Sequence, residues 1–306
     1  MAAILTQIVV LFLIACVGLL VAKLGYLDDR TTNNLNKMLL YVFVPCMIVS
    51  SALGGASTYG QTTVLLMIAS AVALYLLLPV VALGVNALLR IPRERRRLTL
   101  LMTVCGNVGF MGYPVVQAFF GSQALFLNSI ITMFQSIPLY LGAPLLLANR
   151  SEGRRTTLSP RALLSPALVA SVAALVVFFA GIELPAFLAD TIGSIGGITS
   201  PLAMILMGAS LNGVDLKSIA LDWRLHLYTL VKQLVLPFAV WFALSPFFPD
   251  KTVLGIVVVV LAMPVATMTM VLAQQYRSDA AYATRAIVVT TLWSFAILPV
   301  LGIVIG

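Results

Sequence analysis

Long runs of apolar residues make up most of the chain, and short polar stretches separate them. Each run approaches the roughly 20 residues that an α-helix needs to cross the hydrocarbon core of a bilayer. The apolar residues are continuous rather than alternating, which favours helices over the strands of an outer-membrane barrel. The pattern therefore predicts an all-α membrane protein with ten transmembrane helices, at 4–22, 38–53, 62–89, 98–120, 125–148, 162–182, 191–211, 225–244, 253–275 and 280–305.

Composition supports the same class, because 61% of the residues are hydrophobic and only 9% are charged, whereas soluble domains carry about 25% charged residues. Fifteen of the basic residues lie in alternate loops from Lys23 onward, and the opposite loops hold only Lys251. The positive-inside rule then predicts that the Arg-rich loops are cytoplasmic and that both termini are external. The net charge of +8 is explained by this topology, so we expect a lipid bilayer and no nucleic acid as partner.

Two of the apolar runs contain residues that interrupt helices. The stretch 105–114 holds Gly106, Gly109 and Gly112 and ends at Pro114, and the stretch 262–269 contains Pro264. Glycine costs about 1 kcal/mol and proline about 3 kcal/mol in a helix interior. Interrupted segments in corresponding halves of a carrier point to its binding site, so we expect broken helices at spans 4 and 9.

The two halves of the chain resemble each other in the order of their prolines. Three pairs recur at separations of 150 to 158 residues, namely Pro45 with Pro201, Pro79 with Pro237, and Pro114 with Pro264. Five spans per half is an odd number, so the second half must enter the membrane in the opposite direction. The sequence thus predicts a 5+5 inverted repeat, with a first five-helix unit at 1–149, a cytoplasmic linker at 150–161 and a second five-helix unit at 162–306.

Several motifs resemble the auxin efflux carrier family: YVFVP at 41–45, GNVGFMGYP at 106–114, PLAMILMGASL at 201–211, Met263-Pro264, and the pattern from Thr290 to Pro299. The resemblance implies a ten-helix carrier related in fold to sodium/proton antiporters and bile-acid symporters, with a scaffold part and a transport part built on crossed helices 4 and 9. It also implies a homodimer. The short linker is unlike the long loop of PIN-type carriers, which favours a bacterial member in the inner membrane.

The candidate substrate site lies at the two breaks, where half-helix N-termini present partial positive charge that suits anions. In the resemblance, Asn107 maps onto an asparagine that contacts substrate. The predicted substrate-binding residues are Asn107, Gly109, Tyr113, Pro114, Gln135, Lys232, Pro264, Thr267 and Thr269.

Structural roles compete with these functional ones. Asn107 is also suited to bridge the break as a structural amide, and Gln135 to join helices. Tyr113 is suited to packing as well as to stacking on a substrate. Each threonine hydroxyl can satisfy a carbonyl of its own helix. Lys232 has three possible roles: it pairs with a substrate carboxylate, it holds freed backbone carbonyls in place, or it snorkels to the cytoplasmic face.

The acidic residues narrow the function, since no Asp or Glu lies within any predicted span. A cation exchanger that uses paired carboxylates lacks its functional groups here. We therefore predict a secondary transporter of a small organic anion, either an auxin-like acid or a dicarboxylate, that works by alternating access. A sodium-coupled symporter of the bile-acid carrier type is the alternative. An intramembrane enzyme fits poorly, because HExxH is absent and the single histidine, His226, lies at a membrane edge. No metal or cofactor is predicted.

Overall fold

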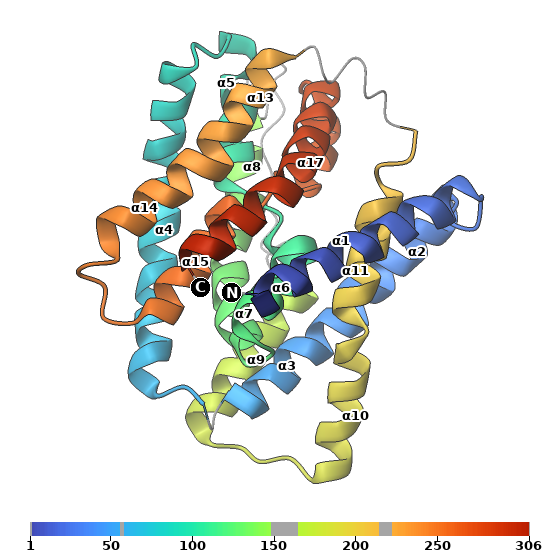
Figure 1. Cartoon of the computed structure of the whole chain (residues 1–306), viewed down its shortest axis with the longest axis vertical. Coiled ribbons are helices and arrows are strands. Elements are labelled where there is room, and N and C mark those ends of the chain that lie inside the picture. Colours follow the sequence, from blue (N-terminus) through green and yellow to red (C-terminus); the bar gives the residue numbers. More distant parts are fainter. Residues whose placement is uncertain (1, 56–57, 148–164, 214–221, 306) are drawn as a thin grey trace.

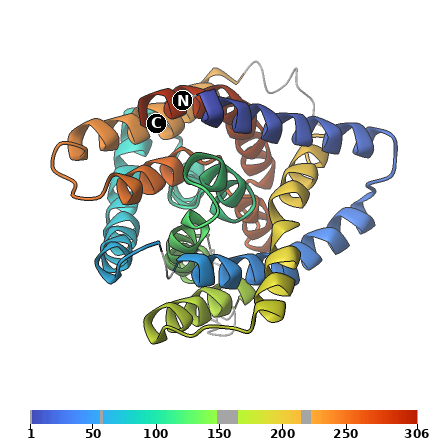
Figure 2. The ribbon, with the colours of Figure 1, turned by 60° about the horizontal axis from the view of Figure 1, so that its bottom comes forward.

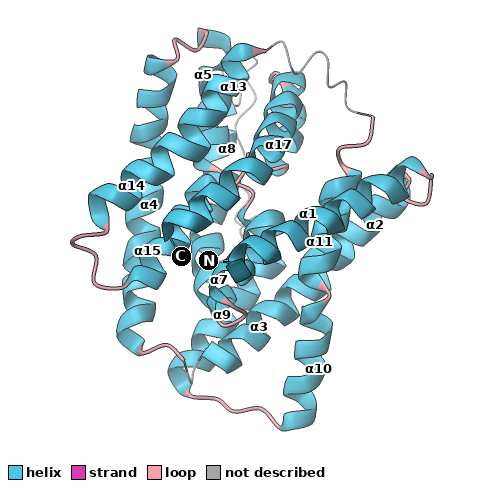
Figure 3. Cartoon of the chain, viewed as in Figure 1, coloured by secondary structure: helices cyan, strands magenta, loops and turns pink. Residues whose placement is uncertain are grey.

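The computed structural model describes residues 2–55, 58–147, 165–213 and 222–305. Within these ranges the chain is helical and contains no strand (Figure 3), which confirms the all-α prediction. The predicted linker at 150–161 lies outside the described residues. The helices, with π-helical turns labelled η, are α1 Ala2–Lys23, α2 Asp29–Met38, η1 Leu39–Phe43, α3 Val44–Gly55, α4 Gln61–Leu88, α5 Arg93–Val104, η2 Val108–Gly112, α6 Tyr113–Phe120, α7 Ala124–Ile137, η3 Pro138–Gly142, α8 Ala143–Leu147, α9 Pro166–Ala180, α10 Ala186–Gly197, α11 Thr199–Ala209, α13 Trp223–Leu230, η6 Val231–Val235, α14 Leu236–Leu244, α15 Lys251–Ala262, α16 Met268–Gln275 and α17 Ala280–Ile305.

In the described part of the chain, seven continuous helical segments are long and apolar enough to cross a membrane. They coincide with seven of the predicted spans. Predicted spans 4, 6 and 9 correspond instead to shorter apolar helices, at Val108–Phe120, Pro166–Ala180 and Lys251–Ala262. The structure therefore supports an integral membrane protein, while the count of ten spans and the inverted repeat stay predictions.

Each π-helical turn in the described part of the chain ends two residues before a proline. The four pairs are Phe43 with Pro45, Gly112 with Pro114, Gly142 with Pro144, and Val235 with Pro237. A proline has no N–H and its ring clashes with the carbonyl four residues earlier, so a regular helix cannot pass through it unchanged. A wider turn absorbs this misfit without ending the helix.

Acidic and hydroxyl side chains fix where several helices begin. Asp250 accepts hydrogen bonds from the N–H groups of Thr252 and Val253 at the start of α15, and the Ser165 hydroxyl accepts one at the start of α9. Asp28 caps α2 in the same way, and its hydrogen bonds from Thr31 lower the pKa of its carboxyl. Such caps satisfy N–H groups that the first turn leaves without partners.

The helices form two groups (Figures 1 and 2). One group contains α1, α3, α9, α10 and α11, and the other contains α4, α5 and α13 to α17. Within the first group α1 and α11 approach so closely that a Cβ on Gly18 or Gly208 would overlap a backbone carbonyl of the opposite helix. Small residues allow this kind of backbone approach between membrane helices. Helices α6 and α7 lie between the groups and contact both.

Candidate functional site

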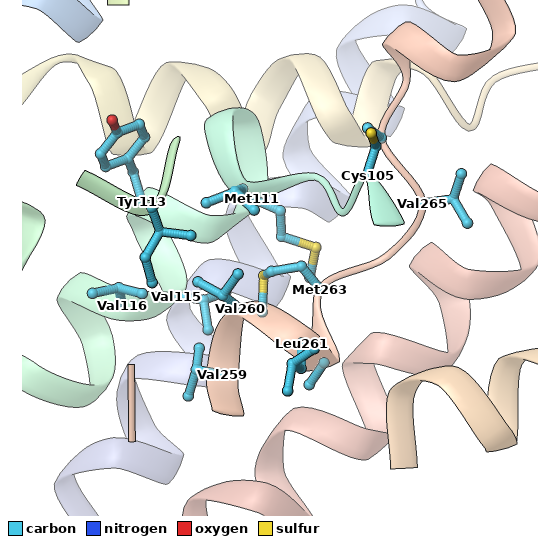
Figure 4. Close-up of a cluster of buried hydrophobic side chains, with 14 of the residues drawn as sticks. Cys105, Met111, Tyr113, Val115, Val116, Val259, Val260, Leu261, Met263 and Val265 are labelled. Carbon is cyan, nitrogen blue, oxygen red and sulfur yellow. The ribbon is translucent and has the colours of Figure 1, made fainter. Parts of the chain in front are cut away.

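The two predicted breaks meet each other near the middle of the molecule. Helix α5 ends at Val104 and α15 ends at Ala262, and the extended segments that follow them pair antiparallel, with a bridge between Gly106 and Val265. The Asn107 N–H donates to the Pro264 carbonyl at 2.7 Å, and the Ala266 N–H donates to the Cys105 carbonyl at 3.1 Å. Figure 4 shows Cys105 and Val265 on these two segments, with Met111 beside Met263. Each break thus satisfies backbone groups that the other has freed, as the interior of a membrane protein requires.

Four buried side chains from neighbouring helices form hydrogen bonds with backbone groups that this pairing leaves without partners. Gln135 of α7 donates to the Gly106 carbonyl. Lys232 of η6 donates to the Met263 carbonyl at 2.6 Å, and its neighbour Gln233 donates to the Ala262 carbonyl at 3.0 Å. The Thr290 hydroxyl of α17 accepts the Val265 N–H at 3.0 Å. We call the paired segments that follow α5 and α15 the crossing. Together with these four side chains it forms a hydrogen-bonded unit to which both halves of the chain contribute.

The position of the first break corrects one expectation. Pro264 lies in its break, but Pro114 lies inside a continuous helix formed by η2 and α6, and the chain leaves the helix earlier, at 105–107. The reason is that the π-helical turn accommodates Pro114, whereas Gly106 and Asn107 have backbone partners across the crossing. The glycine at the start of the stretch marks this break better than the proline at its end.

A cavity of about 450 Å³ lies against the crossing. Its walls come from η1 and the start of α3, from α7 and η3, from the start of α9, and from the residues that begin η2 and α16. None of the described residues that line it is charged; they are Leu40, Tyr41, Val44, Gly106, Asn107, Gly109, Phe110, Tyr113, Thr132, Gln135, Ser136, Leu139, Tyr140, Ser165, Pro166, Ala167, Ala266, Thr267 and Met268. The cavity is thus largely apolar and aromatic, with a few amides and hydroxyls.

Five of the predicted site residues line this cavity, namely Asn107, Gly109, Tyr113, Gln135 and Thr267. The other four, Pro114, Lys232, Pro264 and Thr269, do not. Thr269 is buried, and its hydroxyl donates to the Ala266 carbonyl at 2.7 Å, which is the structural role considered from the sequence.

Of the roles considered from the sequence, Lys232 takes the one in which it holds a carbonyl that the break has freed. Its side chain is only 2% exposed, so it does not snorkel to the membrane surface. Its Nζ bonds the Met263 carbonyl rather than lining the cavity. The lysine therefore acts on the crossing itself.

Asn107 has a structural role and also lies at the cavity, while its contact with substrate stays a prediction. Its Oδ1 accepts the Phe110 N–H at 3.3 Å and so caps η2, while the residue also lines the cavity. Tyr113 lines the cavity as well, and its buried hydroxyl interacts with the side chain of Thr132, which also lines the cavity.

Sequence reasoning missed several lining residues. Thr132 and Ser136 lie one turn apart on α7 and share a face with Gln135, and Tyr41 and Tyr140 add aromatic surface. The signal was present, since polar residues recur at helical spacing in span 5. Gln233 and Thr290 were also missed as parts of the crossing, because their partners are backbone atoms of distant segments.

A second, smaller cavity of about 290 Å³ lies at the other end of α6. Its lining is more polar and again uncharged, and consists of Met47, Ser50, Ser51, Gln117, Ser122, Gln123, Leu125, Gly193, Gly196, Gly197 and Ser200. The Ser200 hydroxyl donates to Gln117 Oε1 at 2.6 Å across it. Both cavities are bounded by α3 on one side and by residues around α6 and α7 on the other.

Comparison with known proteins places these features in a wider context. The sequence model of a family described as membrane transport protein matches residues 3–302. An uncharacterized transporter of Methanocaldococcus jannaschii is 24% identical over 311 residues, which cover 96% of each chain. An uncharacterized transporter of Methanothermobacter thermautotrophicus is 30% identical over 207 residues, or 64% of each chain.

Proposed function

Because the chain belongs to the membrane transport protein family, that of the auxin efflux carriers, we propose that it is a secondary transporter that moves a small organic anion by alternating access. The proposal adds a substrate class and a mechanism to the transporter function that the family provides. It includes the ten-span, 5+5 inverted-repeat architecture, in which the crossing joins spans 4 and 9.

One observation carries the substrate class: two half-helices present their N-terminal ends to the same uncharged cavity. Asn107, Gly109 and Phe110 at the start of η2 and residues 266–268 at the start of α16 line the cavity. Free N–H groups and the helix dipole together favour an anion at such an end. Because no lysine or arginine is among the described residues that line the cavity, we infer that these two ends supply its attraction for negative charge.

The rest of the lining bears on the shape of the anion. Tyr41, Phe110, Tyr113 and Tyr140 offer aromatic surface, and a volume of about 450 Å³ lies in the range of small-molecule sites. A single carboxylate on an apolar body would satisfy both parts of the lining. A dicarboxylate would place its second charge against apolar or neutral groups. We therefore favour an auxin-like acid over a dicarboxylate.

The two cavities support alternating access. Both lie along the contact between α3 and the helices around α6, one at each end of α6. By the positive-inside rule the larger cavity lies toward the cytoplasmic side, since Ser165 follows the Arg-rich stretch, and the smaller one lies toward the external side. Sliding or rocking of one helix group against the other would open each in turn.

Orientation can be tested directly by labelling single cysteines with a membrane-impermeant reagent. We expect an engineered cysteine at Gly60 to label from outside intact cells, and one at Arg97 to label only after the membrane is opened. The same topology places both termini outside the inner membrane of a bacterium. External labelling at Arg97 would reverse the topology.

The substrate class is tested by binding and uptake with purified protein in proteoliposomes. We expect indole-3-acetate to bind and to be taken up, and indole-3-acetamide, which has the same body without the charge, to bind at least about tenfold more weakly, a difference of roughly 1.4 kcal/mol. Malonate serves as the dicarboxylate probe. Equal affinity for the acid and its amide would contradict recognition of the anion by the helix ends.

A matched pair of variants tests whether the carboxylate of the substrate binds at the start of η2. Asn107→Asp keeps an oxygen that can cap η2 and adds negative charge where the carboxylate should lie, so indole-3-acetate binding should be lost while the melting temperature stays close to that of the parent. Asn34→Asp makes the same change at an exposed position of α2 and should leave binding intact. Unchanged binding by Asn107→Asp would remove this end of η2 from the site.

A further inference from the structure

Lys232 is a buried lysine with no acidic partner among the described residues. The ion pair between Arg95 and Asp279 does not involve it, and no Asp or Glu lies within the predicted spans. Moving an ammonium group out of water costs several kcal/mol unless protein groups compensate. The group that compensates here is the Met263 carbonyl, at 2.6 Å from Nζ.

The site of this bond is the C-terminal end of a half-helix. Met263 is the C-cap residue that follows α15, and the last carbonyls of a helix lack N–H partners and carry the negative end of the dipole. Gln233 bonds the neighbouring Ala262 carbonyl through Nε2, and its Oε1 is buried with no hydrogen-bond partner among the described residues. Two successive carbonyls at this helix end are therefore bonded by the neighbouring residues Lys232 and Gln233.

Carriers with broken helices use this kind of place for a coupling ion, because unwound carbonyls and half-helix C-termini coordinate Na⁺. We propose that the Lys232 ammonium is a tethered cation, which takes at the end of α15 the place of a bound monovalent cation and frees the protein from any need for sodium. The inference concerns the ion and not the organic anion. It therefore stands apart from the proposed substrate class, and its test contains no organic acid.

The test removes the tether and supplies the cation in solution. Lys232→Ala deletes three methylenes and the ammonium group, and n-propylammonium has the same chain length. In sodium-free buffer we expect Lys232→Ala to melt well below the parent, and n-propylammonium to restore most of that loss with saturation. 1-Propanol, which has a similar shape without charge, and tetramethylammonium, which cannot donate a hydrogen bond, should have no effect.

Two control variants separate this response from general effects of amines. Lys251→Ala removes an exposed lysine that also donates to a carbonyl, that of Ser245, and should not respond to n-propylammonium. Lys232→Met fills the space with a neutral chain of similar length and should not respond either. A response of all variants alike, or a Lys232→Ala protein that melts with the parent and ignores n-propylammonium, would overturn the proposal.

A measurement on the unmodified protein covers the case in which Lys232→Ala does not fold. With a tethered cation, exchange of choline for sodium should leave the melting temperature unchanged, because no vacant cation site exists to stabilise the folded state by mass action. A saturable rise of the melting temperature with sodium would overturn the proposal and favour the sodium symporter.

Discussion

The second break depends on a hydrogen bond to the Thr290 hydroxyl. A substitution can remove this hydroxyl with almost no change in the shape of the side chain. The side chain is fully buried, and its hydroxyl accepts the Val265 N–H at 3.0 Å while donating to the Ala286 carbonyl at 2.7 Å. Thr290→Val replaces this hydroxyl by a methyl group. The Val265 N–H then loses its acceptor in a place where Val265 itself is fully buried.

The size of the effect follows from what is left unpaired. A buried donor without a partner costs about 1–3 kcal/mol, whereas the lost bond to the helix's own carbonyl contributes little. Thr284→Val is the matched control, because Thr284 makes the same bond to a carbonyl four residues earlier, that of Ala280, at an exposed position of the same helix. We expect Thr290→Val to be less stable than Thr284→Val by about 1–3 kcal/mol, which lowers the melting temperature by roughly 2–6 °C.

Two measurements check this. Thermal unfolding in detergent compares the two variants, and hydrogen exchange reports on the Val265 amide, which should lose protection in Thr290→Val and keep it in Thr290→Ser. If Thr290→Val melts together with Thr284→Val and the Val265 amide stays protected, the hydroxyl does not hold the break and the reasoning fails.

Two more predictions concern packing and the prolines. Gly208→Ala should destabilise the protein by about 1–3 kcal/mol, since the new Cβ would overlap a carbonyl of α1. The control Gly84→Ala, whose new Cβ meets no atom within 4 Å, should be neutral or slightly stabilising. Comparison of the melting temperatures of the two variants tests this. Pro264→Ala should lower indole-3-acetate uptake far more than Pro114→Ala, because only Pro264 lies in a break; equal uptake by both variants would contradict this.

Much of the fold was accessible from local patterns. Apolar runs of membrane-spanning length predicted where helices lie, and glycine and proline marked both breaks, because these residues act on their own segment. Asn107, Gly109, Tyr113, Gln135 and Thr267 line one cavity because they flank the breaks or face them, and their role in substrate binding stays a prediction.

The partners of the broken segments were not accessible in this way. Gln233 and Thr290 bond backbone atoms 25 or more residues away, and nothing in their own segments indicates which carbonyl or N–H they meet. Lys232 is the clearest case, because charge and depth were visible in the sequence while its acceptor, a carbonyl at the end of another helix, was not. Such contacts depend on how the two halves cross.

At the crossing, the C-terminal and N-terminal helix ends differ in their hydrogen-bond partners. This difference bears on the proposed selection of an anion. The carbonyls at the ends of α5 and α15 are bonded by protein donors: Cys105 by the Ala266 N–H, Gly106 by Gln135, Ala262 by Gln233 and Met263 by Lys232. The residues that begin η2 and α16 instead line the cavity. The negative ends are therefore bonded inside the protein, whereas the positive ends, although η2 is partly capped by Asn107, face the cavity. Under the proposed function a carboxylate would gain from both positive ends at once, whereas a cation would meet them with no acidic side chain among the described lining residues to offset the repulsion.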